Sequence, residues 1–371
     1  MNNKKKYADL VNEIHTSQQT GWYLYGAGII AYNISLSLFE VNGFQPTGII
    51  VTSRNEKDNF FAYEDITVLK ECQESICKES LFVIATPEEY HESIAESLKN
   101  AGFLRHIFID NELEYEIMAA YFRKTGDFIM LEDSMTVLDN EKMGKPDFGV
   151  YMGRCHADKI LKGQYELPDY IIPIQVGTVF TEQKLCEISD DSGQNISFKN
   201  KNYSELTATY WVWKNTSHDY KGICHYRRYL VLPEGAVNFL VKSNIDMIVP
   251  LPFICQDNIS QQYGRYISGE DFDNLMKAIK DLSNQDYELA KKVFRGSIIY
   301  NYNMLIARRE VFDDYCTWMF DILEQAEKYC DPLQIRADRY AGYLGELLTT
   351  LYIIKEKNKL RLYHVEKKWM I

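Results

Sequence analysis

Residues 22–31, WYLYGAGIIA, decide the fold of the first part of the chain. The apolar run Trp22–Tyr25 has the composition of a short buried strand, and it leads through a glycine-rich turn into a helical pattern that continues to Glu40. Further strands of this kind are expected at 47–51, 81–86 and 106–110. Strands that alternate with helices of this length predict a small parallel α/β sheet.

The turn in this segment matches the G-x-G-x-x-G/A pattern of dinucleotide-binding loops through Gly26, Gly28 and Ala31. The first glycine allows a tight turn, the second lets a phosphate approach the backbone, and Ala31 permits close packing of helix on strand. After the second strand, residues 52–54 read TSR, where an NAD site needs an acid for the ribose. NAD(P) is therefore a disfavoured cofactor, and two interpretations remain: a site for another nucleotide, or a tight turn without a ligand.

The composition of the whole chain is that of a globular protein. With 371 residues, 46% of them hydrophobic, we expect two or three domains with substantial cores. The formal net charge of -12 argues against general nucleic-acid binding, because an acidic protein does not concentrate around polyanions. The eight cysteines include no CxxC pair and are expected to be free thiols of a reducing cytoplasm. No apolar run approaches about 18 residues, so we expect neither a signal peptide nor a membrane span.

A polar stretch divides the chain into two predicted domains. The first covers 1–123, residues 124–147 with two glycines and Pro146 are expected to form a linker, and 148–371 form a second α/β unit. In the second unit the patterns predict one helix over 203–215 and single strands over 221–230, 297–309 and 359–369.

The second unit carries several motifs in a fixed order. They are IIPIQVG at 171–177, DDSGQNIS at 190–197, ELTATYWVW at 205–213, HYRRY at 225–229 and NMLI at 303–306. Together they resemble a family of bacterial capsular and exopolysaccharide glycosyltransferases that has long been classed as a domain of unknown function. The first unit, through YGAGIIA at 25–31 and the stretch 83–103, is similar to the small Rossmann-like domain found ahead of bacterial sugar acyltransferases.

This resemblance implies an α/β fold, with a small Rossmann-like N-terminal domain followed by a GT-A-like glycosyltransferase domain. It also implies a nucleotide-sugar donor, with a UDP-hexose such as UDP-galactose as the expected one, and a saccharide or lipid-linked saccharide acceptor in surface-glycan synthesis. Partner enzymes of glycan assembly are expected with it. The basic tail, which ends near Trp369 and Met370, is interpreted either as a contact with the inner face of an anionic membrane or as a solvated edge strand.

The HYRRY motif is the predicted site of the donor diphosphate. Many GT-A enzymes neutralise this leaving group with a metal ion held by D-x-D, but here the corresponding strand ends in His225, Tyr226, Arg227 and Arg228. The planar fork of arginine matches phosphate oxygens, so the two arginines can take the place of a metal. His225 can donate to phosphate or coordinate a divalent ion such as Mn or Mg. In the alternative interpretation, one arginine only pairs with a surface carboxylate.

Five further polar or glycine positions complete the predicted donor site. They are Gln175, Gly177, Asp190, Asn195 and Asn303. The carboxylates that open the DDSGQN loop can bind a metal, a ribose or acceptor hydroxyls, with Asp191 as the second candidate metal ligand. The alternative is an Asx turn that caps the next element, for which Asp, Ser and Asn are common.

An inverting glycosyl transfer needs a carboxylate that deprotonates the acceptor hydroxyl. Glu346 in GYLGELL is the first candidate, with Asp338 and Asp191 after it. The family has Glu-Arg where this chain has Glu346-Leu347, and a retaining reaction needs no such base. The alternative for Glu346 is a solvated helix residue. Two other functions remain open: an NAD(P)-dependent sugar-nucleotide oxidoreductase or epimerase, and a non-catalytic nucleotide-sensing module.

Overall fold

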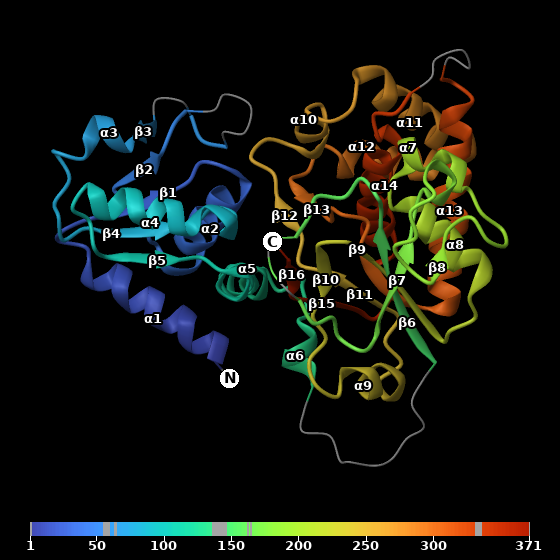
Figure 1. The fold of residues 1–371 in the computed structure, drawn as a ribbon, viewed down its shortest axis with the longest axis horizontal. Coiled ribbons are helices and arrows are strands. Elements are labelled where there is room, and N and C mark those ends of the chain that lie inside the picture. Colours follow the sequence, from blue (N-terminus) through green and yellow to red (C-terminus); the bar gives the residue numbers. More distant parts are fainter. Residues whose placement is uncertain are drawn as a thin grey trace. The chain divides into compact units, whose positions relative to one another are not determined.

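The computed structural model describes residues 2–54, 60–62, 65–135, 147–161, 163, 165–330 and 336–370. The chain divides into two units, one that ends at Phe128 and one that runs from Ile129 to Met370 (Figure 1). Of the stretch expected to be a linker, residues 136–146 lie outside the described residues. Residues just before them pack on the second unit, because Met130 bridges to His364 and is buried there.

The first unit contains a five-stranded sheet in the order β3-β2-β1-β4-β5. Its strands are β1 (Trp22–Tyr25), β2 (Gly48–Val51), β3 (Ile66–Val68), β4 (Leu81–Ile84) and β5 (His106–Phe108). Every pairing in this sheet is parallel, as predicted. The order 3-2-1-4-5 is that of Rossmann-like sheets.

Helices cover both faces of this sheet because successive strand residues point to opposite sides. Leu24 and Val83 face the helices α1 (Asn2–Thr16), α2 (Ile29–Asn42) and α5 (Asn111–Thr125). Tyr25 and Ile84 face α3 (Leu69–Cys72) and α4 (His91–Asn100), the latter preceded by the short helix η2 (Glu88–Tyr90). The unit is therefore a three-layer α/β sandwich (Figure 1).

The second unit is built on a nine-stranded mixed sheet. Seven strands follow the order β15-β11-β14-β9-β6-β7-β8, and β10 and β16 extend from β9. The bounds are β6 (Phe148–Arg154), β7 (Ile171–Gln175), β8 (Ile188–Ser189), β9 (Tyr220–His225), β10 (Arg228–Leu230), β11 (Met247–Pro250), β14 (Leu305–Arg308), β15 (Leu362–Val365) and β16 (Lys367–Trp369). A separate short ladder joins β12 (Phe253–Ile254) to β13 (Ile298–Ile299).

Helices also cover this second sheet. The helices α6 (Leu131–Ser134) and α9 (Ala236–Lys242) contribute to one apolar layer together with residues of β6, β9 and β11. The helices α8 (Leu206–Asn215) and α13 (Arg309–Glu327) pack on β6, β9 and β14, and α14 (Tyr340–Glu356) packs on α13 (Figure 1). The remaining helices are α7 (Asn200–Tyr203), α10 (Ile259–Tyr263), α11 (Gly269–Leu282) and α12 (Asn284–Val293), with the short turns η3 (Thr178–Phe180) and η4 (Ser197–Lys199).

Four predicted elements differ from the structure. The stretch 221–230 is a tight hairpin of β9 and β10, because β10 also pairs with β16 from the C-terminus, a partner that the local pattern does not reveal. The stretch 297–309 is broken into β13 and β14 by Tyr302 and Asn303, which have φ values of 75° and 51°. The stretch 203–215 forms two helices because Ser204 has a φ of 51°. The expected strand at the tail is likewise split into β15 and β16.

All eight cysteines are free thiols. In the part of the chain that the structure describes, no helix combines the length and the apolar character needed to cross a membrane.

Candidate active site

Three parallel strands of the second sheet end at one edge. In the register of the sheet, Gln175 at the end of β7 pairs with Arg154 at the end of β6, and Gly153 pairs with His225 at the end of β9. Ligands of open α/β sheets bind outside the carboxyl ends of their parallel strands. The HYRRY hairpin therefore stands at the edge where a ligand is expected.

Arg228 is held by two aromatic rings. Its guanidinium carbon lies 4.0 Å from the centre of the Tyr302 ring and 3.7 Å from that of Trp369, which β16 places opposite it. The residue is 5% exposed, and its Nε has no hydrogen-bond partner among the described residues. Aromatic faces stabilise the charge without using the N–H donors, so these donors remain for an anion.

Three more arginines belong to this region: Arg227 and Arg339, whose charges act on His225, and Arg154, which ends β6 next to the partner of His225. Arg227 follows in the hairpin turn, with its guanidinium carbon 5.6 Å from the centre of the Trp369 ring and its buried Nε without a partner among the described atoms. Arg339 donates from Nε to Ser204 at 2.9 Å. Over the described ranges, no Asp or Glu is ion-paired with Arg154, Arg227, Arg228 or Arg339. In a chain of net charge -12, four arginines for which the described residues offer no carboxylate ion pair are a candidate anion site.

His225 is neutral in this setting. Burial holds its pKa well below the ordinary 6.5, and the charges of the neighbouring arginines act in the same direction. Its Nδ1 lies 3.4 Å from a terminal guanidinium nitrogen of Arg228. A neutral imidazole can accept this hydrogen bond and still donate from its other nitrogen.

A carboxylate that the motifs did not indicate lies close to the arginines. Asp158 follows β6 and accepts the backbone N–H of Cys155 at 2.7 Å. Burial raises the pKa of Asp158 to about 6, although that hydrogen bond and the charges of Arg154, Arg339 and Arg227 oppose the rise.

Glu346 lies on α14 and is half-buried, so the interpretation as a solvated helix residue is wrong. Its Oε2 accepts the hydroxyl of Tyr263. Desolvation raises its pKa to about 7. The negative charge of Glu205 also raises this pKa, whereas the positive charge of Arg228 lowers it. A carboxylate with this pKa can take and release a proton near neutral pH.

The buried amide of Asn303 supports the turn beside Glu346. Its Nδ2 donates to Glu205 at 2.8 Å and to the carbonyl of Gly342 at 3.0 Å, and its Oδ1 accepts from Thr349 at 3.2 Å. These bonds hold the left-handed backbone of Tyr302 and Asn303 in place. Asn303 therefore fixes the neighbours of Glu346, with both ends of its amide already bonded.

Asp190 is fully buried and joins two loops. Its carboxylate accepts the N–H of Gly177 at 2.9 Å, the hydroxyl of Thr207 at 2.7 Å and the hydroxyl of Ser197 at 2.6 Å. Gly177 has a φ of 64°, which favours glycine. Asp190 thus stabilises the loops behind the sheet edge.

The remaining polar residues of this region make local contacts. Gln175 is buried and binds the 183–185 backbone through both ends of its amide. Asp191 is exposed and accepts from Ser189 at 2.6 Å, while Asn195 donates to the carbonyls of Asp191 and Gly193. In this structure the polar side chains of the DDSGQN loop bond within the loop itself, as the alternative interpretation of an Asx-type turn predicted.

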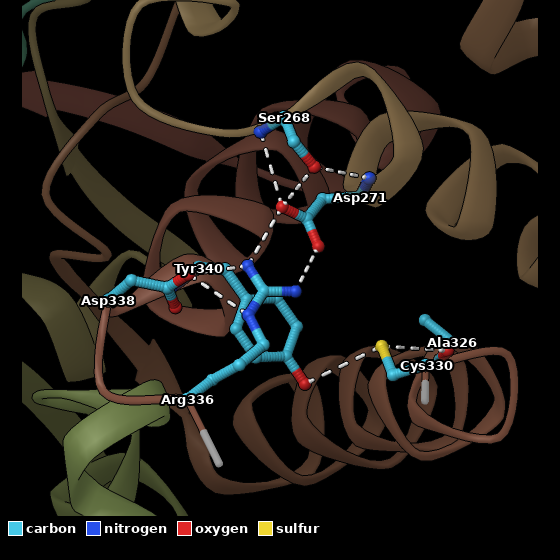
Figure 2. A network of polar contacts seen from close by, with 7 residues as sticks. All are labelled: Ser268, Asp271, Ala326, Cys330, Arg336, Asp338 and Tyr340. Atoms are coloured by element: carbon cyan, nitrogen blue, oxygen red, sulfur yellow. Dashed lines mark hydrogen bonds and ion pairs between the residues drawn. The ribbon is translucent and has the colours of Figure 1, made fainter. Parts of the chain in front are cut away.

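Asp338 lies just before α14, beside a buried ion pair (Figure 2). Arg336 bonds to Asp271 at 2.5 and 2.9 Å and to Asp338 at 2.6 Å, and its guanidinium carbon is 3.9 Å from the centre of the Tyr340 ring. Asp338 also accepts the backbone N–H of Tyr340 at 3.3 Å. Its carboxylate is thus engaged by the start of α14, whereas that of Glu346 faces Tyr263 and Tyr302.

Comparison with known families and structures decides the relationship. A family described as a domain of unknown function, DUF4422, matches residues 159–358, which is more than half of the chain. The chain belongs to the DUF4422 family. The matched region contains the HYRRY hairpin, the Asp190 loop and Glu346.

One solved structure adds a fold relationship. The DUF4422 chain is similar to the apo structure of WbbM, a bifunctional glycosyltransferase, with a TM-score of 0.51 and 26% identity. The likeness covers 60% of this chain and 45% of WbbM, so the chain spans less than half of that protein. It supports the predicted α/β fold, with a Rossmann-like unit and a GT-A-like unit. No curated protein matches the chain.

The donor groups of the DUF4422 site do not fit a divalent metal. The described part of the chain contains no group of three or more His, Cys, Asp or Glu side chains arranged to hold one. His225 stands among arginines, and Asp191 is an exposed loop residue bonded to Ser189.

The glycine loop lies outside the DUF4422 match, in the first unit. Gly26 has a φ of 124°, and an added Cβ would come within 2.7 Å of the Ala85 carbonyl oxygen. Gly28 caps α2, and Ala31 is fully buried on that helix. The geometry is that of a tight strand-to-helix turn at the centre of a Rossmann-like sheet.

Sequence reasoning did not name five residues of the candidate site: Arg154, Asp158, Tyr263, Tyr302 and Arg339. The rule that ligands lie outside the carboxyl ends of parallel strands would have drawn attention to Arg154, at the end of β6, and to Asp158 in the loop after it. No local pattern marks Tyr263, because its partner Glu346 lies on a distant helix.

Proposed function

We propose that this DUF4422 chain is a glycosyltransferase that moves a hexose from a UDP-sugar, such as UDP-galactose, to a saccharide or lipid-linked saccharide acceptor of a surface glycan. The observation that carries the proposal is the set of arginines at the sheet edge: Arg154, Arg227, Arg228 and Arg339, for which the described residues provide no carboxylate ion pair. The similarity to a bifunctional glycosyltransferase supports the reaction class.

The arginines act on the leaving group. In the transfer, the acceptor hydroxyl oxygen attacks the anomeric carbon, and the bond from that carbon to the β-phosphate oxygen breaks. The electron pair leaves with the nucleoside diphosphate, whose growing charge is stabilised by fixed cations placed before the reaction. The guanidinium of Arg228 is packed against the rings of Tyr302 and Trp369, so little reorganisation is needed.

Glu346 receives the acceptor proton if the reaction inverts configuration. Its pKa of about 7 leaves a substantial fraction ionised at neutral pH and still makes the carboxylate a stronger base than a solvated glutamate. The hydroxyl of Tyr263 orients it. A retaining reaction would leave Glu346 without this role, so the stereochemistry of the product tests the assignment.

A thermal-shift screen with UDP, GDP, CMP, NAD and their sugar conjugates tests the substrate class. We expect UDP and UDP-hexoses to raise the Tm, and NAD to leave it unchanged. Stabilisation by NAD alone would favour the oxidoreductase alternative and contradict the proposal. Stabilisation by UDP that persists in the double variant Arg227→Ala, Arg228→Ala would place the nucleotide elsewhere, with the glycine loop of the first unit as the next site to test.

Metal dependence is tested separately. Because the hairpin presents arginines where a metal-binding enzyme presents carboxylates, we propose that transfer proceeds without a divalent ion. Activity should survive excess EDTA. Loss with EDTA and recovery with Mn or Mg would show that the arginines do not carry the charge neutralisation alone.

A further inference from the structure

One turn contacts both halves of the proposed chemistry. The ring of Tyr302 lies 4.0 Å from the guanidinium carbon of Arg228, and the next residue, Asn303, bonds to Gly342 and Thr349, which flank Glu346 on α14. The anion-binding group and the acid–base group are therefore attached to a single turn.

This turn is rigidly built. Tyr302 and the next residue, Asn303, both have positive φ, a conformation that persists only when its surroundings enforce it. The buried amide of Asn303 supplies that enforcement through Glu205, Gly342 and Thr349. The ring of Trp369, which also contacts the ring of Tyr302, lies 3.7 Å from the guanidinium carbon of Arg228 and limits its movement.

The charges around Glu346 are few and identifiable. From α10 it faces Tyr263, from the start of α8 Glu205, and from β10 Arg228. The helices α11 and α12, which also pack on α14, bring buried Asp271 and Asp286. These two carboxylates are already paired with arginine and lysine side chains, Arg336 and Lys355. Among the groups with the largest effect on Glu346, Arg228 is the cation.

We propose that occupancy of the arginine site by a nucleotide diphosphate and protonation of Glu346 favour each other, and that Tyr302 is the positioning residue that joins the two events. This rests on the proposed function. An anion on Arg228 cancels the positive charge that favours the ionised carboxylate, so Glu346 holds its proton more tightly when the donor is bound. Linkage is reciprocal, and the protonated enzyme must then bind the donor more tightly.

The consequence is a base that strengthens when the donor arrives. Without donor, Arg228 favours the ionised form of Glu346 and weakens it as a base. With donor, the same carboxylate gains proton affinity just when an acceptor hydroxyl has to be deprotonated. This linkage changes the proton affinity of Glu346 and does not act on hydrolysis of the bound donor by water.

Isothermal titration of the full chain with UDP-galactose between pH 6 and pH 8.5 tests the proposal. This probe has no phosphate monoester, so it does not itself titrate near pH 6. We expect the Kd of the wild-type protein to rise at least about fivefold over this range, the lower end of usual coupling between sites. In Glu346→Gln the Kd should stay constant within about twofold, since no proton is exchanged there.

Three variants separate the contributions. Tyr302→Phe keeps the aromatic ring beside Arg228 and should keep the pH dependence of the Kd for UDP-galactose. Tyr302→Leu loses the ring, so binding should weaken and the pH dependence should shrink. Trp213→Leu removes a ring on α8 whose cation contact is Lys214, at 3.1 Å, and should leave both unchanged.

Each outcome decides between the proposals. No binding of UDP-galactose at any pH would contradict the proposed function itself. Binding whose pH dependence is the same in the wild type and in Glu346→Gln would overturn the linkage alone. Loss of that dependence in His225→Asn but not in Glu346→Gln would assign the proton to the histidine and overturn the role of Glu346.

Discussion

The raised pKa of Glu346 predicts that the ionised carboxylate destabilises the folded protein. In Glu346→Gln the amide oxygen still accepts the hydroxyl of Tyr263, but the side chain cannot ionise. At about 1.4 kcal/mol for each pH unit of displacement, a rise from the ordinary 4.5 to about 7 corresponds to about 3 kcal/mol. This is an upper bound, because the half-buried side chain keeps some contact with water.

The sign of the effect follows from linkage. Below pH 4.5 the carboxyl is protonated in both the folded and the unfolded chain and makes no difference. Between pH 4.5 and pH 7 only the unfolded chain releases its proton, so the free energy of unfolding falls as the pH rises. The wild-type protein therefore loses up to about 3 kcal/mol relative to Glu346→Gln over this window, and the difference stays constant above it.

Urea unfolding followed by circular dichroism at pH 4, 6 and 8 measures this difference. The matched control is Glu187→Gln, whose side chain is 92% exposed. A difference between the wild type and Glu346→Gln that stays the same from pH 4 to pH 8 would refute the account of Glu346. The same result would remove the basis for its role as a base near neutral pH.

Three further substitutions test other parts of the second unit. Asp190→Ala should cost about 3 kcal/mol or more in urea unfolding, because several buried donors lose their acceptor, whereas exposed Asp191→Ala should change stability by less than about 0.5 kcal/mol; equal costs would contradict the assignment of Asp190 as a structural group. Arg336→Met should cost about 3 kcal/mol at pH 7, since it leaves a buried carboxylate unpaired. Desolvation favours the neutral form of Asp271, but the bonds from Arg336 and from Ser268 outweigh it and hold its pKa below the ordinary 3.8. The stability cost of Arg336→Met should therefore shrink as the pH falls below about 4. A stability cost that does not vary with pH would contradict this. Trp369→Leu should raise the KM for UDP-galactose about fivefold, the loss expected for one cation–π face, while Trp369→Phe should restore it; an unchanged KM in Trp369→Leu would contradict the aromatic support of the guanidinium.

Local sequence patterns were sufficient for the first unit. The alternation of apolar strands with helices around WYLYGAGIIA predicted a parallel sheet, and the structure has one with five strands. Such a sheet is assembled from neighbouring segments of the chain, so each strand carries its own signal. Two elements were not predicted: the first helix, α1, because it is strongly polar, and the strand β3, because it has only three residues.

In the second unit the same patterns failed where partners are distant in sequence. The HYRRY stretch reads as one strand, but it folds into a hairpin because the C-terminal strand pairs with Arg228 through Trp369. The NYNM stretch reads as a continuous strand as well, and only the buried bonds of Asn303 enforce the left-handed turn. Neither partner is visible within a local window.

The candidate site shows the same division. Residue type, together with the family resemblance, predicted Arg227 and Arg228 as phosphate-binding groups, because arginine can take the place of acidic metal ligands. Residue type could not distinguish buried Asp190, whose hydrogen-bonding capacity is used within the protein, from Glu346, whose pKa is raised by its surroundings. That distinction depends on burial and on partners, which only the fold supplies.

The central claim is that paired arginines stabilise the departing diphosphate, and the kinetics of Arg227→Gln test it most directly. Release of UDP from UDP-galactose, with an acceptor present, is compared between this variant and the wild-type protein, after circular dichroism has shown that both are folded. We predict a fall in kcat of about 100-fold or more, the loss typical of one preorganised charge-stabilising donor. A kcat within about twofold of wild type would contradict the claim, because the leaving charge would then be neutralised by other groups.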